Sequence, residues 1–441
     1  CSGNNNVAIG NQAGYSQTTD VGHVHIGYQA GYTTNGSSNP SVFIGYQCGY
    51  GNQTGSNIVA IGRDTLRSNT TGGNNTAVGY QVAYNNTTGA DNTAVGIQSL
   101  YSCPYGFGNT ALGVSAMGNG TANPTYNVAV GREALLATSG TNNVAVGASA
   151  LRQGTTISNC VAVGQGALYS NTANGNTAVG LQALYLNTTG VDLVAVGYQA
   201  LYYNTTGVDN TAIGYQALQG CTYGNYNVAI GYNAGVGITT GFRNVAIGRT
   251  ALTTCTTGGY NTAVGMYSAN SLTIATSAAC FGYNSGANIT TGSNNVCVGD
   301  SSGTDAVANL TTQNNYIVMG NNGHTNANIK IAWTVTSDIR DKNLIGDVPK
   351  GLDFVNSLNP IKYQFKVSRD DNTPHGPVRY GFSAQDVLKL EGESPVIINA
   401  DDPDHLKYND SYMTPVLVNA IKELSAQVDE LKAEIAKLKG K

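Results

Sequence analysis

A serine and a lysine lie five residues apart in the segment TVTSDIRDKNLIGDV, which spans 334–348. A serine hydroxyl becomes a strong nucleophile when a nearby base removes its proton, and a lysine amine can be that base once burial lowers its pKa. Ser337 and Lys342 could therefore attack a peptide carbonyl. This spacing is common in proteins, so a solvated charged turn remains the alternative.

A pair of residues with metal-binding chemistry lies near the N-terminus, in the segment GHVHIG at 22–27. His23 and His25 are two positions apart, so in a strand they point to the same side. If that side faced a threefold axis, three chains would present six imidazoles, enough to ring an octahedral transition metal. The alternative is a solvent-facing or stacked histidine pair. No other cofactor is predicted.

The chain is rich in glycine and poor in charge, with 57 glycines among 441 residues, 10% charged residues and a net charge of -4. Disordered chains are usually highly charged, so a packed or fibrous structure is expected. The first lysine is Lys330 and no basic patch is present, which excludes nucleic acid as a predicted partner. No apolar run is long enough to predict membrane insertion.

The first ten residues, CSGNNNVAIG, nearly repeat TSGTNNVAVG at 138–147, so we interpret the sequence as starting in mid-repeat. The eight cysteines form no CxxC pair, and most of them replace Ala, Asn or Thr of a repeat. We expect small buried thiols rather than metal ligands or a disulfide framework.

A glycine that closes VAIG, TAVG or a variant recurs every 16 to 18 residues from Gly10 to Gly299, and once more at Gly320. We call it the marker glycine. A typical unit is NTAVGLQALYLNTTGVD at 176–192. The pattern predicts a strand before the glycine, a second short strand in QAL and a turn at NTTG. Units this short must stack to bury a core, which predicts a mainly β fold, a parallel β-roll or β-solenoid of about nineteen 17-residue repeats over 1–320.

Columns of side chains follow from this repeat. Ile or Val one residue before the marker glycine, and Val or Thr three before it, are predicted to form the core. Alanine two before it and asparagine four before it are predicted to face outward, toward a close-packed neighbouring chain, with the asparagine amides stacked. Tyrosines five residues after several marker glycines form an outer ladder, which either covers the roll with its hydroxyls in water or stacks on sugar rings.

At these motifs the repeats resemble the head repeats of trimeric autotransporter adhesins, which carry SVAIG-like units in a left-handed parallel β-roll. The units of this chain are a few residues longer than those of that family. The resemblance covers about 1–320 and implies a homotrimer with three rolls side by side.

The composition changes near residue 337: residues 1–336 hold 7 Lys/Arg and 8 Asp/Glu, and residues 337–441 hold 14 and 17. We predict a junction at 321–336 and a small α+β domain at 337–441. Its expected elements are a helix at 351–358, strands at 361–368 and 394–400, a strand entering a helix at 379–390, and a long helix.

The long helix carries a coiled-coil seam over 412–439, because its apolar residues alternate by four and three. By the pattern rule alone, β-branched residues at one seam position with leucine at the other favour a coiled coil of two helices. The seam residues are Leu417, Ile421, Leu424, Val428, Leu431, Ile435 and Leu438.

Four motifs occur in order over 337–441, namely SDIRDK, GLDFVNSLNPIKYQFK, YGFSAQDV and KYNDSYMTPVLVNAIKEL. Together they closely resemble the C-terminal chaperone-of-endosialidase domain, which ends many phage tailspikes and tail fibres and some bacterial surface proteins. The resemblance implies a trimeric intramolecular chaperone that holds three chains in register while the upstream fibre folds. The domain then cuts itself off.

The same resemblance assigns roles to individual residues. Ser337 matches the family's nucleophile and Lys342 its base, and the cut falls at the bond between Ser337 and Asp338. Asp338 and Arg340 match the rest of the motif. Asp341 departs from the pattern, because many members carry an apolar residue there.

The predicted function is therefore a homotrimeric phage tail fibre of the virion tail that attaches to a host receptor, most simply a glycan. Its only enzymatic activity would be single-turnover self-cleavage. The alternative is a bacterial cell-surface adhesin with the same chaperone end. A glycosidase needs paired carboxylates in a cleft, and the eight acidic residues of 1–336 are scattered along the repeats.

Overall fold

The computed structural model describes residues 3–440 except 37, 38, 121, 122, 138, 306, 307, 325–336, 367–370, 401, 402, 404 and 405. The chain divides into two compact units. The first comprises Cys1–Thr304 and Leu310–Met319, and the second Asp305–Asn309 and Gly320–Lys441. Most of the predicted junction at 321–336 lies outside the described residues.

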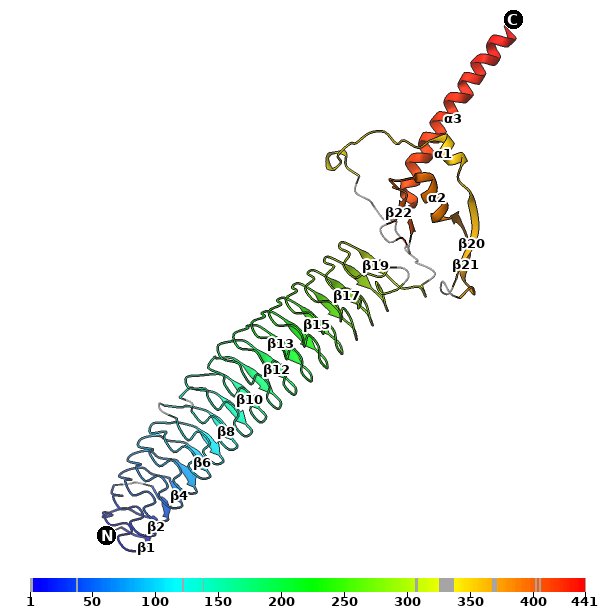
Figure 1. The fold of residues 1–441 in the computed structure, drawn as a ribbon. Helices are drawn as coiled ribbons and strands as arrows, with labels where there is room; N and C mark the ends of the chain where they lie inside the picture. The colour runs from blue at the N-terminus through cyan, green and yellow to red at the C-terminus, as the bar shows by residue number, and fades with distance from the viewer. Residues whose placement is uncertain are drawn as a thin grey trace. The chain divides into compact units, whose positions relative to one another are not determined.

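The first unit is a parallel β-solenoid in which each repeat forms one coil, and Figure 1 shows the coils stacked in sequence order. Each coil contributes one three-residue strand that pairs, parallel and in register, with the strand of the next coil. The predicted parallel roll of about nineteen repeats is confirmed. The strands are β1 (Val7–Ile9), β2 (Val24–Ile26), β3 (Val42–Ile44), β4 (Val59–Ile61), β5 (Thr76–Val78), β6 (Thr93–Val95), β7 (Thr110–Leu112), β8 (Val128–Val130), β9 (Val144–Val146), β10 (Val161–Val163), β11 (Thr177–Val179), β12 (Val194–Val196), β13 (Thr211–Ile213), β14 (Val228–Ile230), β15 (Val245–Ile247), β16 (Thr262–Val264), β17 (Ala279–Phe281), β18 (Val296–Val298) and β19 (Ile317–Met319).

The segment after the marker glycine forms a turn, so the predicted second strand is wrong. After β11, Gln182 has φ 55° and Leu184 has φ 52°, and both values lie in the left-handed region. A strand requires extended backbone with negative φ at every residue. Two left-handed residues separated by one position turn the chain tightly, which the alternation of apolar residues alone did not reveal.

The alanine column, two residues before the marker glycine, forms the core of the solenoid. Ala178 and Ala195 are fully buried, whereas Val179 is 36% exposed and Ile9 is 59% exposed. The predicted assignment of faces is therefore wrong: alanine points inward, and the Val and Ile residues point outward. The physical reason is that the strand and the left-handed turn of one coil face each other across a thin interior, which leaves room only for small side chains on the strand.

Side-chain sizes on the two sides of this interior are complementary. Where the strand carries a large residue in the alanine column, the facing turn position, usually leucine, is glycine. A Cβ on Gly49 would lie 2.4 Å from the ring of Phe43, and a Cβ on Gly31 would lie 2.7 Å from the ring of His25. The interior is filled to a fixed width by paired residues.

The marker glycines stack directly on one another. Gly197 has φ 136°, and a Cβ there would lie 2.3 Å from the carbonyl oxygen of Gly214 in the next coil. The position therefore requires both a conformation that other residues avoid and the absence of a side chain. This explains why the glycine closes every repeat.

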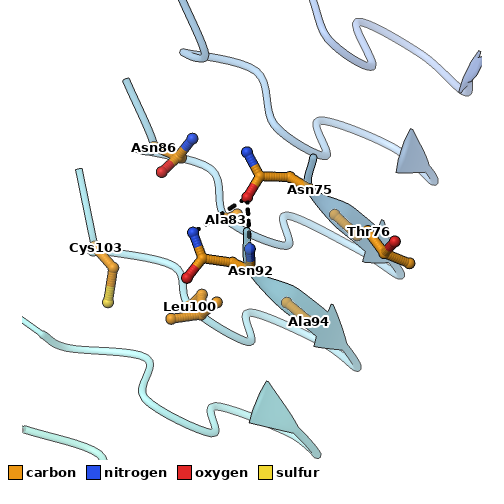
Figure 2. Close-up of a pocket in the computed structure, with 9 residues that line it drawn as sticks. Asn75, Thr76, Ala83, Asn86, Asn92, Ala94, Leu100 and Cys103 are labelled. Carbon is orange, nitrogen blue, oxygen red and sulfur yellow. Dashed lines mark hydrogen bonds between the residues drawn. The ribbon is translucent and has the colours of Figure 1, made fainter. Parts of the chain in front are cut away.

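Asparagine side chains form the predicted ladder, and they lie inside the solenoid. The backbone N–H and the Nδ2 of Asn92 both donate to Oδ1 of Asn75, at 3.0 and 3.1 Å, as Figure 2 shows. Nδ2 of Asn92 also donates to the carbonyl oxygen of Gly106 at 2.8 Å. The Asn75 and Asn92 amides thus satisfy polar atoms of adjacent coils, and these hydrogen bonds compensate the free-energy cost of their burial.

The second unit combines a hairpin, short helices and one long helix. Val387, Ile397, Ile398, Met413 and Val416 form its buried core. The expected α+β elements are present, although the strand predicted at 394–400 is only two residues long. The elements are η1 (Ile339–Asp341), α1 (Leu352–Asn356), β20 (Pro360–Lys366), β21 (Pro374–Phe382), α2 (Ala384–Glu391), β22 (Ile398–Asn399), β23 (Lys407–Tyr408) and α3 (Asp410–Lys439); β20 pairs antiparallel with β21, and β22 with β23.

Helix α3 is 30 residues long, and the seam predicted for a coiled coil faces solvent in the single chain. Ile421 is 65% exposed and Leu431 is 57% exposed. In the part of the chain that the structure describes, no helix has the length and apolar character needed to cross a membrane.

Because the alanine column faces the interior of the solenoid, enlarging two different alanines of one coil should change stability by different amounts. Ala145 on β9 is fully buried, and Ala148, three residues later, is exposed. We expect Ala145→Leu to lower the free energy of unfolding by about 1–3 kcal/mol or more through overpacking, and Ala148→Leu to change it by less than about 0.5 kcal/mol. Urea unfolding followed by circular dichroism measures both values, and equal effects would contradict the assignment.

Candidate functional site

The motif SDIRDK forms one tight turn at the start of the matched C-terminal motifs. Asp338 caps the one-turn helix η1, because its Oδ1 accepts a hydrogen bond from the backbone N–H of Arg340 at 2.9 Å. At the other end, the N–H of Lys342 donates to the carbonyl oxygen of Ile339 at 3.2 Å. This turn brings the residues before and after it close together.

The turn joins the two residues that the sequence singled out for chemistry. Nζ of Lys342 donates to Oγ of Ser337 at 2.6 Å. Both side chains are exposed in the single chain. The distance is that of a direct hydrogen bond between a nucleophile and a candidate base, which is the geometry that serine activation requires. The catalytic roles of both residues stay predictions.

Arg340 holds the carboxylate beside the predicted cleavage bond. Its Nε lies 3.1 Å from both Oδ1 and Oδ2 of Asp338. Hydrogen bonds from the Arg340 side chain and backbone lower the pKa of Asp338, and the carboxylate raises the pKa of the guanidinium. Asp338 and Arg340, one on each side of Ile339, therefore stabilise the turn. Arg340 contacts Asp338 and so stabilises the conformation of the segment, rather than acting on Ser337.

Residues 337–394 match the protein family described as chaperone of endosialidase. The match begins at Ser337 and runs through the turn, the β20–β21 hairpin and α2. No curated protein matches the chain. The protein thus carries a C-terminal segment of the chaperone-of-endosialidase type after a long β-solenoid, an arrangement consistent with a tailspike or fibre.

One residue that organises the matched segment was missed in the sequence. Glu391, at the end of α2, is buried, and its two carboxylate oxygens accept hydrogen bonds from the backbone N–H groups of Val396, Ile397 and Ile398 at 2.8 to 2.9 Å. Three donors compensate the burial of the charge and fix the chain that leads into β22. No spacing signal in the sequence points to this role.

His23 and His25 lie inside the solenoid, because the strand face that carries them is the inner face. Both are fully buried, and the ring centroids of His25 and Phe43 are 5.4 Å apart. Their predicted outward orientation is wrong for the same reason as that of the alanine column. Among the described residues, no group of three or more His, Cys, Asp or Glu side chains could hold a metal ion. A transition metal at a trimer axis stays a prediction, and it would require both rings to leave the interior.

The tyrosine ladder has the geometry of a covering rather than of a sugar platform. The rings of Tyr15 and Tyr32 stack with centroids 5.0 Å apart, and those of Tyr32 and Tyr50 at 5.1 Å. Arg67 continues the column with its guanidinium 5.4 Å from the ring of Tyr50. Each ring face is covered by the next side chain of the column. A sugar can therefore reach the ring edges and hydroxyls along the ladder, but it can reach a ring face only at the end of a stack.

The seven described cysteines are buried free thiols, as expected from their place in the repeat: Cys48, Cys103, Cys160, Cys221, Cys255, Cys280 and Cys297. Burial raises the pKa of Cys48, Cys103 and Cys221 to about 12. These thiols remain protonated at neutral pH and are poor nucleophiles.

The buried His25 makes the N-terminal coils sensitive to acid. Burial, followed by the nearby charge of His23, lowers the pKa of His25 from 6.5 to about 4. The unfolded chain then binds a proton at a higher pH than the folded coil. Above about pH 6.5, the pKa of His25 in the unfolded chain, protonation costs the folded coil no stability. As the pH falls from about 6.5 to about 4, the free energy of unfolding decreases by about 3 kcal/mol in total.

Hydrogen exchange of β1 to β3, corrected for intrinsic rates, measures this loss between pH 7 and pH 4. His25→Ala restores the usual residue of the column, so we expect it to remove most of the pH dependence of protection in these strands. An equal pH dependence in both proteins would show that His25 is not its source.

Proposed function

We propose that the protein is a homotrimeric fibre whose C-terminal domain assembles three chains in register and then removes itself by cutting the Ser337–Asp338 bond. The observation that carries this proposal is the 2.6 Å contact between Lys342 and Ser337, in the segment that matches the chaperone-of-endosialidase family. A serine nucleophile and a lysine base in contact supply the attacking group and the proton transfer that peptide cleavage needs.

The outer face of the strands supports a trimer. Val, Ile and Leu residues form an apolar stripe along the coils, and isolated soluble proteins rarely expose contiguous apolar surfaces of this length. Packing against the same stripe of neighbouring chains would cover it. Its most exposed members are Val7, Ile9, Val59, Ile61, Val95, Leu112, Val179, Ile213, Ile230, Phe281, Val298, Ile317 and Met319.

The exposed seam of α3 supports the same assembly at the other end of the chain. A heptad seam is covered when parallel helices pack knobs into holes. Three chains joined at this helix would enter the repeat region at equivalent positions. A chaperone is needed because a shift by one coil keeps almost every contact in a solenoid of near-identical coils, so the register is weakly specified.

The setting we propose for this fibre is the tail of a phage virion, where it attaches to a host-surface receptor, with a glycan as the receptor class. No metal cofactor, nucleic acid partner or membrane insertion is part of this proposal. The second candidate is a bacterial surface adhesin with the same chaperone end, which the likeness of the repeats to adhesin head repeats favours.

Self-cleavage is tested by intact-mass spectrometry of freshly expressed protein. We expect the wild type to split into 1–337 and 338–441. Ser337→Ala and Lys342→Ala should stay whole or be cut at least about a hundredfold more slowly, because they lack the nucleophile and the base. Ser425→Ala, an exposed serine on α3, is the matched control and should be cut like the wild type. A whole wild-type chain would refute self-cleavage.

Trimer formation is tested in the Ser337→Ala background, which keeps the chain whole. We expect the double variant Leu424→Asp/Leu431→Asp to lose the trimer, since two charges in each helix seam cannot be buried without partners. Gln427→Asp adds a charge on the same helix outside the seam and should leave the trimer intact. Light scattering measures the molar mass, and trimers in the seam variant would contradict the proposed coiled coil.

A further inference from the structure

We propose that the cut is made between chains: Ser337 of one copy attacks the Ser337–Asp338 bond of a second copy in the trimer. This inference rests on the proposed self-cleavage. It adds that the nucleophile and the bond that it breaks belong to different chains, so the reacting site is incomplete in a single chain.

Covalent geometry is the first argument. Oγ of Ser337 is joined to its own carbonyl carbon through only Cβ and Cα. Attack on that carbonyl would close a four-membered ring, far from the separation and alignment that a nucleophile needs for reaction. The residue on the amino side of the bond therefore cannot cut the bond with its own hydroxyl.

The exposure of the pair is the second argument. Lysine acts as a base only after it has lost its proton, and removal from water is the usual cause of that loss. Ser337 and Lys342 are both exposed in the single chain, and Arg340, which ties the turn together, has a side chain that is 85% exposed. Within the described part of the chain the pair is open to water, and in the proposed trimer a second copy would supply the surface that covers it.

The symmetry of a trimer is the third argument. A threefold axis places three equivalent turns at the same level and relates each one to the next by the same rotation. In this arrangement the chains would meet head-to-tail around the axis. The Ser337 hydroxyl of each chain can then reach the Ser337–Asp338 bond of one neighbour, so each chain cuts one neighbour and is cut by the other. The α3 seam brings the chains together in that parallel arrangement.

The chemical steps balance with water as the only added reactant. Neutral Lys342 takes the proton from Oγ of Ser337 in the same chain, and Oγ bonds to the carbonyl carbon of Ser337 in the neighbour. The C–N bond to the neighbour's Asp338 then breaks, and Lys342 returns the proton to the departing amine. Water hydrolyses the resulting ester, which releases the carboxyl group of the neighbour's Ser337 and restores the hydroxyl.

The test uses mixed trimers of the full chain. Wild type and Ser337→Ala, which is given an N-terminal tag so that its mass differs, are co-expressed in equal amounts, and the fragments are identified by intact mass. We expect about half of the Ser337→Ala chains to be cut after residue 337, because about half of them have a wild-type chain as their cutting neighbour. About half of the wild-type chains should stay whole for the reciprocal reason.

Other outcomes overturn the inference. If every wild-type chain is cut and every Ser337→Ala chain stays whole, the reaction occurs within one chain. A fragment that ends at Thr336 instead of Ser337 would indicate attack on the preceding carbonyl, again within one chain. If wild type expressed alone stays whole, the proposed self-cleavage fails as well. Light scattering of Ser337→Ala alone first establishes that this chain assembles.

Discussion

The contact between successive coils is the constraint on which the rest of the structure depends. Coils stack at the spacing of parallel strands, and at that spacing the marker glycines meet backbone to backbone and the asparagine amides meet side chain to side chain. Any side chain at the glycine position would separate the coils. Stability is then a sum of similar contacts between neighbouring coils, rather than the product of one central core.

The thin interior that follows from this stacking explains why the solenoid has an apolar outer surface. Alanine facing leucine fills the space inside a coil, so the larger valine and isoleucine residues of each strand have no room inside. They form an apolar outer stripe instead. A solenoid of this kind leaves its largest strand residues uncovered in isolation, and its near-identical coils do not specify which coil of a second chain should cover them. If several chains pack through these stripes, their register must come from elsewhere in the chain, and the C-terminal domain is the part with a non-repetitive sequence.

The period of the repeat and the place of the strand before each marker glycine were predictable, because each depends on local spacing, whereas the second strand predicted after that glycine is a turn. The Ser337–Lys342 pair was singled out through the resemblance of its motif, since a serine and a lysine five residues apart are common. The face that points inward was not, since alternation defines two faces without saying which is buried, and hydrophobicity favoured the wrong one. A usable signal existed in the pairing of residues: Phe43 occurs with Gly49, and His25 with Gly31. Such compensation across six residues identifies interior positions. The hydrogen bonds to Glu391 were not predictable, because they depend on a fold that brings a helix end to a later strand.

The structure of the 337–342 segment connects the proposed chemistry to the proposed assembly. In one chain the turn at 337–342 already holds the hydroxyl and the amine together, yet it leaves both in water. Positioning is thus complete before assembly, while the desolvation that lysine needs is absent. If the bond to be cut also comes from a neighbour, the reaction depends on assembly for its environment and for its substrate. Cutting would then follow registration of the chains, and loss of the domain would leave a fibre that is kinetically stable because its template is gone.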